Sequence, residues 1–265
     1  MTTLRARAQA VPGSRYIATK VPQITLLFWL AKLLTTGGGE TAWDWMSNSL
    51  GQYLAFGLSG AALVTALVTQ FALRRYNPWV YWIAVAMVSV FGTGVADIMH
   101  NDFAVPYTVS TSVLLGAVVA MFGLWYAVER TLSFHSVLTP RREAFYWAAV
   151  LLTFALGTAA GDWSATSLGL GYLPSGILFG VLFLLPGLAW WKFGLNAVPA
   201  FWLSYVLTRP LGASFADFLA GPGQRGGLEL GMPPITIGIA ACTAAVVWWF
   251  ARTRVDQLPA AERAR

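Results

Sequence analysis

Four aspartates of this chain recur at one distance from a tryptophan and a glycine, in the pattern W-x9-G-x4-D. They are Asp44, Asp97, Asp162 and Asp217, within the segments GETAWD, GTGVAD, GTAAGD and GASFAD. A spacing of three residue types that occurs four times indicates an internal repeat. Each aspartate falls near the end of a long apolar segment, where burial in lipid and the negative end of a helix dipole both disfavour a carboxylate. We therefore expect compensation by a bound cation, by a proton or by a hydrogen bond to a neighbouring repeat.

Other polar side chains share a helix face with the aspartates, because residues four positions apart lie on one side of a helix. These stripe residues are Lys32, Thr36, Glu40, Ser89, Thr93, Thr158 and Arg209. A polar stripe on a helix in lipid is expected to face the interior of a bundle or a hydrated cavity. Together with the four aspartates, these residues include two bases and five acids, whose charges sum to −3, so the combined set favours cations over anions.

We predict a cation or proton pathway formed by the four aspartates and Glu40, with Lys32 and Arg209 as counter-charges. Carboxylate and hydroxyl oxygens suit Mn, Mg or Ca, so a bound divalent cation is the one cofactor this set would hold. His100 and Asp102, in the loop sequence HND, are weaker additional metal ligands. The alternative is that the charged residues pair with one another and only lock the repeats in register.

Catalysis is less expected than transport or assembly, and no catalytic residue is assigned. The chain has no HExxH, no Walker loop, no GxGxxG after a strand and no Ser/His/Asp set at helical spacing. Hydrolysis within the membrane by an aspartate pair stays a weaker alternative. No basic run is interleaved with aromatics, so nucleic acid is not an expected partner. The single Cys242 lies in an apolar run, which excludes an intramolecular disulfide or a cysteine metal site.

The composition predicts that an integral membrane bundle positions these residues. Of the 265 residues 57% are hydrophobic and 11% charged, against about 25% charged in soluble domains, and the mean hydropathy is +0.62. Since a bilayer core needs about 20 apolar residues per helix, we expect eight transmembrane α-helices. The predicted spans are 21–44, 50–73, 79–98, 105–128, 144–162, 172–191, 198–218 and 231–250.

Basic residues between the spans predict the orientation. Fourteen Lys and Arg residues fall on one side and only Arg225 on the other, which places both termini in the cytoplasm. We expect a cytoplasmic leader at 1–20, one membrane domain at 21–250 and a cytoplasmic tail at 251–265. The membrane domain divides into four two-helix repeats of the same orientation, at about 21–77, 78–140, 141–197 and 198–250.

The repeated glycines and tryptophans have simpler expected roles. Glycine allows helix backbones to approach closely, so close packing is predicted for the repeated Gly39, Gly92, Gly157 and Gly212. The same role is expected of Gly57 and Gly60 in the second span and of Gly176 and Gly180 in the sixth. Each repeated tryptophan lies near the predicted cytoplasmic start of its helix, which favours an anchor at the membrane interface.

The motifs KLLTTGGGETAWDW, VFGTGVADI, TFALGTAAGDW and TRPLGASFADF resemble those of a bacterial membrane-protein family defined by a tandem "repeat of unknown function". The resemblance covers about residues 22–250. It implies a multi-pass protein of the bacterial inner membrane with four two-helix repeats, and it implies nothing specific about activity.

Together these observations predict a small secondary transporter or channel for an inorganic cation, either a divalent metal or a proton-linked ion. The alternative is a non-transporting structural or partner-binding membrane protein. The lipid bilayer is the expected partner, and an oligomer is compatible with eight helices.

Overall fold

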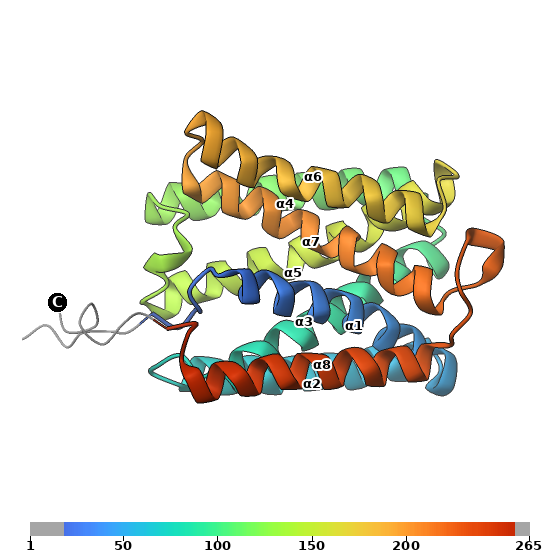
Figure 1. Cartoon of the computed structure of the whole chain (residues 1–265), viewed down its shortest axis with the longest axis horizontal. Helices are drawn as coiled ribbons and strands as arrows, with labels where there is room; N and C mark the ends of the chain where they lie inside the picture. Colours follow the sequence, from blue (N-terminus) through green and yellow to red (C-terminus); the bar gives the residue numbers. More distant parts are fainter. Residues whose placement is uncertain (1–18, 258–265) are drawn as a thin grey trace, which may run out of the picture.

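The computed structural model describes residues 19–257, and that part of the chain is all helical, without strands (Figure 1). Residues 1–18 and 258–265, which include most of the predicted leader and part of the predicted tail, lie outside the described residues. The eight long helices are α1 (Leu26–Leu50), α2 (Gln52–Ala72), α3 (Pro78–Asn101), α4 (Tyr107–Glu129), α5 (Pro140–Asp162), α6 (Tyr172–Phe193), α7 (Ala197–Ala220) and α8 (Met232–Thr253). Three short helices join them, η1 (Phe134–Ser136), η2 (Trp163–Ser167) and η3 (Gly223–Arg225).

Each predicted span corresponds to one long helix, with shifted ends. The largest shift is at α1, which begins after Thr25 because the Thr25 side chain caps the helix by accepting a hydrogen bond from Phe28 N at 3.1 Å. The same helix continues past Asp44 to Leu50, so this aspartate lies inside the last two turns and not at the helix end.

Six of the helices are long and apolar enough to cross a membrane: α2, α3, α4, α5 extended by η2, α6 and α8. This indicates a membrane-embedded protein. Helices α1 and α7 have similar lengths, 25 and 24 residues, and are not among the six. They carry the bases of the polar stripe, Lys32 and Arg209, together with acids. Eight spans therefore require that the charges on α1 and α7 be neutralised inside the bundle.

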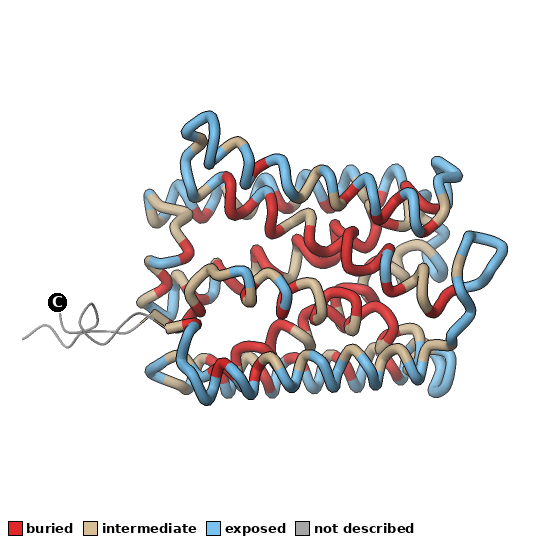
Figure 2. The backbone as a smooth tube through the Cα atoms, viewed as in Figure 1, coloured by how far each residue is buried: buried red, intermediate tan, exposed pale blue. Residues whose placement is uncertain are grey.

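The first helices of the four hairpins, α1, α3, α5 and α7, form a closed inner ring. Helix α1 packs on α3, α3 on α5, α5 on α7 and α7 on α1. Buried residues concentrate on these four helices, whereas α2, α4, α6 and α8 are largely exposed (Figure 2). Each outer helix packs on the inner helix of the next hairpin, and α8 packs on α1, which completes the cycle. No hairpin is therefore a self-contained unit.

The repeated glycines are the points where neighbouring inner helices touch. A Cβ added at any of them would overlap the side chain that lies seven residues after the repeated tryptophan in the next inner helix. The pairs are Gly39–Ser89, Gly92–Phe154, Gly157–Arg209 and Gly212–Thr36. The prediction of close packing is confirmed at these four glycines, where the packing follows the cycle of the ring. It is wrong at Gly57 on α2, where an added Cβ would meet no atom within 4 Å.

The prediction of interfacial anchoring is wrong for three of the four repeated tryptophans. Trp82, Trp147 and Trp202 are at most 5% exposed and belong to the main hydrophobic core, while Trp29 is half-buried. The residue before each tryptophan is also a buried aromatic, namely Phe28, Tyr81, Tyr146 and Phe201. These rings pack on one another across the inner helices, so the tryptophans are buried by the neighbouring repeats. We call this end of the ring the aromatic end.

Two chain segments cover the aromatic end. Lys20 Nζ lies 2.6 Å from Glu143 Oε2, and Gln70 Nε2 donates to the other oxygen of Glu143 at 3.1 Å. Val21, the residue after Lys20, is buried against the hydrophobic core. Asp256 accepts a hydrogen bond from Tyr76 Oη at 2.5 Å, and its backbone oxygen accepts one from Gln23 N at 2.8 Å. The segments before α1 and after α8 are thus held together.

Candidate functional site

The end of the ring opposite the aromatic end carries the repeated aspartates, and we call it the acidic end. Asp44 lies on α1, Asp97 on α3, Asp162 on α5 and Asp217 on α7, and all four are partly exposed. Asp44 interacts electrostatically with Asp97 and Asp162, so the four inner helices bring their aspartates to one place.

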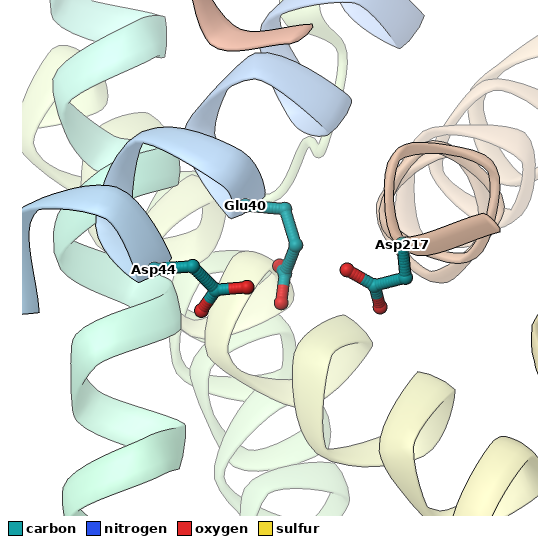
Figure 3. A group of neighbouring side chains, drawn as sticks. All are labelled: Glu40, Asp44 and Asp217. Atoms are coloured by element: carbon teal, nitrogen blue, oxygen red, sulfur yellow. The ribbon is translucent and has the colours of Figure 1, made fainter. Parts of the chain in front are cut away.

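Three carboxylates converge most closely, those of Glu40, Asp44 and Asp217. One oxygen from each lies within 4.8 Å of the others, and the Glu40 carboxylate stands between the two aspartates (Figure 3). Glu40 and Asp44 are one turn apart on α1, and the packing of α7 on α1 brings in Asp217. We call these three residues the acidic trio. Within the described residues, these three side chains are the group of potential metal ligands that lie close enough together to hold one ion.

The other two aspartates of the acidic end differ in their partners. Asp97 accepts a hydrogen bond from Trp43 Nε1 at 2.6 Å. Among the described residues no hydrogen bond reaches the side chain of Asp162, which faces the charge of Glu40. Sequence reasoning missed Trp43. The signal is in the second repeat, where Gly94 leaves the space that the Trp43 ring fills.

Arg209 is buried at the base of the acidic trio and joins three inner helices. Its Nη2 donates to Glu40 Oε2 at 2.5 Å and also to Thr93 Oγ1, while Nη1 donates to the backbone oxygen of Thr36 at 2.9 Å. The arginine is 1% exposed and Glu40 is 5% exposed. Removing one partner of such a pair leaves a buried charge uncompensated, which costs about 3–5 kcal/mol. The structure brings Arg209 to Glu40, and within the described chain none of the four aspartates forms a salt bridge.

Lys32 lies deeper in the ring and contacts no acid among residues 19–257. Its side chain is 1% exposed, and in the described part of the chain its Nζ has no hydrogen-bond partner. The ammonium lies 3.6 Å from the centre of the Phe154 ring and 4.1 Å from that of Tyr205. Sequence spacing gave no signal for this contact with two aromatic faces.

The remaining predicted residues lie outside the acidic trio. Each buried stripe hydroxyl donates to a helix carbonyl, Thr36 to Leu33, Ser89 to Thr36, Thr93 to Ser89 and Thr158 to Phe154. The His100 ring stacks on Tyr107, with ring centres 3.6 Å apart, and its Nδ1 lies 3.0 Å from the Val105 oxygen. Asp102 is exposed in the loop after α3. Neither residue is part of the trio.

This arrangement suits positive ligands. Five carboxylates share the acidic end. The Arg209 guanidinium forms an ion pair with Glu40, and Arg225 adds a second positive charge that acts on Asp162. Neighbouring carboxylates in partly dry surroundings do not all remain ionised unless a cation binds or protons are taken up. Oxygen donors of this kind bind hard divalent ions such as Mn²⁺, Mg²⁺ and Ca²⁺.

Comparison with known proteins identifies the repeat. The family model described as Repeat of Unknown Function (DUF347) matches residues 80–131, 145–195 and 200–256. These are the hairpins α3–α4, α5–α6 and α7–α8. The hairpin α1–α2, which carries Lys32 and Glu40, is outside the matched segments. Searches of curated proteins and of solved structures gave no match. Since the matched segments cover more than half of the chain, the protein belongs to the DUF347 repeat family.

Proposed function

We propose that the protein is a small secondary transporter that binds an inorganic cation, a divalent metal ion, at the acidic trio. The observation that carries this proposal is the convergence of Glu40, Asp44 and Asp217 to within 4.8 Å. Asp97 and Asp162 stand beside the trio and extend the negative field that attracts the ion. Arg209 occupies one oxygen of Glu40 and competes with the ion for it.

The transporter that we propose crosses a bacterial inner membrane eight times, as four hairpins of the same orientation. The Glu40–Arg209 pair supports two further spans, because it neutralises a charge on α1 and one on α7 inside the bundle. The distribution of Lys and Arg favours cytoplasmic termini, and the acidic end then faces outward. An outward acidic end would collect cations from outside the cell.

The second candidate is a non-transporting protein in which the charges only assemble the ring. The bonds of Arg209 to α1 and α3 favour it, because they would fix the register of three helices without any ligand. The surroundings of the aspartates favour the transporter. An assembly device needs each of them in a dry, hydrogen-bonded contact, whereas all four are partly exposed and only Asp97 has a hydrogen-bond donor in the described chain.

The acidic trio can be tested by Mn²⁺ binding and by flux. We expect the purified protein to bind Mn²⁺ in paramagnetic resonance titrations, and Asp44→Asn/Asp217→Asn to weaken binding at least 10-fold, since two of three charged ligands are lost. Mn²⁺ flux into proteoliposomes should fall in parallel. Asp102→Asn is the matched control, because it removes an exposed carboxylate outside the trio. Wild-type binding and flux in the double variant would exclude the trio, and binding without flux in the wild type would favour the second candidate.

A further inference from the structure

One charged group of the inner ring has no role in the proposed cation site, namely Lys32. Its counterparts in the other three repeats are Val85, Val150 and Tyr205, so it carries the only charge at its level of the ring. The side chain is buried, its Nζ has no hydrogen-bond acceptor among the described residues, and it is held between the faces of Phe154 and Tyr205. Ring faces attract an ammonium but replace its lost hydration only in part.

The ionisable groups around Lys32 add no negative charge. Helix α7 presents Tyr205 and Arg209, and Arg209 is the charged group that acts on Lys32. The aromatic end, one turn away, contributes Tyr81 of α3 and Tyr146 of α5, whose hydroxyls bond each other at 2.5 Å. The ionisable side chains of the other helices packed on α1 all point outward and are exposed: Tyr53 on α2, and Cys242 and Arg252 on α8.

Of the two buried bases on the inner ring, Lys32 and Arg209, only one can lose its charge readily. A guanidinium stays protonated in proteins, whereas a lysine that is buried without an acceptor releases its proton easily. When it does so, the Nζ–H bond breaks, nitrogen keeps the electron pair and the proton leaves to water. Lys32 can therefore alternate between an ammonium and a neutral amine while Arg209 keeps its pair with Glu40.

We propose that Lys32 is the proton-binding site that is coupled to the acidic trio, so that the protein exchanges a divalent cation for a proton. Glu40 is eight residues after Lys32 on α1, which separates the two levels by about 12 Å along the helix. A divalent ion at that distance lowers the proton affinity of an amine by a factor on the order of 100 at the effective dielectric of proteins. Cation arrival thus expels the proton, and reprotonation of Lys32 expels the cation. This proposal rests on the proposed cation site.

The test is the number of protons released when Mn²⁺ binds, measured by titration calorimetry in buffers of different ionisation enthalpy. We expect Lys32→Met to bind Mn²⁺ and to release about one proton fewer per ion than the wild type. Its affinity should also depend less on pH and be higher than that of the wild type at low pH. Lys32→Arg keeps the charge permanently and should show the same smaller proton release. Lys192→Met is the control, because Lys192 also contacts an aromatic ring, Trp191, but is exposed.

The outcomes separate the two proposals. If the wild type does not bind Mn²⁺, the cation site itself is refuted. If Lys32→Met and Lys32→Arg bind Mn²⁺ and release as many protons as the wild type and Lys192→Met, only the role of Lys32 is refuted. Lys32→Met is expected to fold, because it replaces a buried charge without an acceptor by an apolar side chain of similar length.

Discussion

The cyclic glycine contacts make a prediction that depends on geometry alone. In Gly39→Ala, the new Cβ would overlap the Ser89 side chain and lie 3.0 Å from the Ser89 backbone carbonyl carbon. Overpacking of this kind costs about 1–3 kcal/mol, and alanine regains up to about 1 kcal/mol of helix propensity. Since the backbone of α3 must move as well as the side chain, we expect a net loss of about 1–2 kcal/mol.

A control and a rescue distinguish ring packing from a general effect of alanine. Gly57→Ala on α2 meets no atom within 4 Å, so it should be neutral or stabilise by up to about 1 kcal/mol. Ser89→Gly removes the overlapping side chain. It gives up a long hydrogen bond, 3.4 Å from Ser89 Oγ to the Thr36 oxygen, and about 0.5 kcal/mol of helix propensity in α3. Added to Gly39→Ala, it should restore about 1 kcal/mol, with the remainder lost to the backbone contact.

The assay is reversible unfolding of the purified chain in mixed detergent micelles, followed by tryptophan fluorescence. The free energy of unfolding should decrease in the order Gly57→Ala, wild type, Gly39→Ala/Ser89→Gly, Gly39→Ala. Equal stability of Gly39→Ala and Gly57→Ala would refute the ring contact. The reasoning would also be wrong if Ser89→Gly cost the same with glycine or alanine at position 39.

Three further predictions concern the buried charges. Arg209→Met leaves Glu40 buried without its partner and should destabilise the fold by about 3–5 kcal/mol, whereas Arg209→Met/Glu40→Gln should lose clearly less in the same unfolding assay. Lys20→Met leaves the buried Glu143 carboxylate without its basic partner and should destabilise the fold by about 3 kcal/mol. Adding Glu143→Gln should recover most of this loss, and an equal loss in the single and double variants would count against the ion pair. Burial raises the pKa of the Asp256 carboxyl in the folded state, so the free energy of unfolding should fall as pH rises from about 4 through that pKa. Asp256→Asn can still accept the hydrogen bond from Tyr76 and should remove this pH-dependent part of the stability. Melting temperatures of the two proteins at pH 4 and 7 detect the difference, and the same pH dependence in both would contradict the prediction.

The helices and the glycine contacts were predictable because they depend on local signals. Eight apolar stretches of about 20 residues specify eight helices, and the repeated spacing assigns each glycine to the same helix level. The burial of Trp82, Trp147 and Trp202 was not predictable in this way. An aromatic residue near a helix end is compatible with the membrane interface and with the protein core. Which of the two it occupies depends on the neighbouring helices of the ring.

The partners of the charged residues were also beyond the sequence. The spacing of four residues predicted that Lys32 and Glu40 lie on one face of α1, but it did not predict which helix packs against that face. Arg209 is 169 residues from Glu40 in the chain, and only the packing of α7 on α1 brings them together. Nothing in the sequence distinguishes the base that finds an acid, Arg209, from the base that finds two aromatic rings, Lys32.

The Glu40–Arg209 pair also has a consequence for how the protein is made. In the eight-span arrangement that we propose, α1 reaches the membrane with Glu40 unpaired and waits for a partner 169 residues later in synthesis. At about 5–20 residues per second, the delay is about 10–30 s. Helix α1 would be translated before the other seven helices and would be among the last to settle in lipid. Until α7 emerges, the insertion machinery or another membrane protein would have to shelter it.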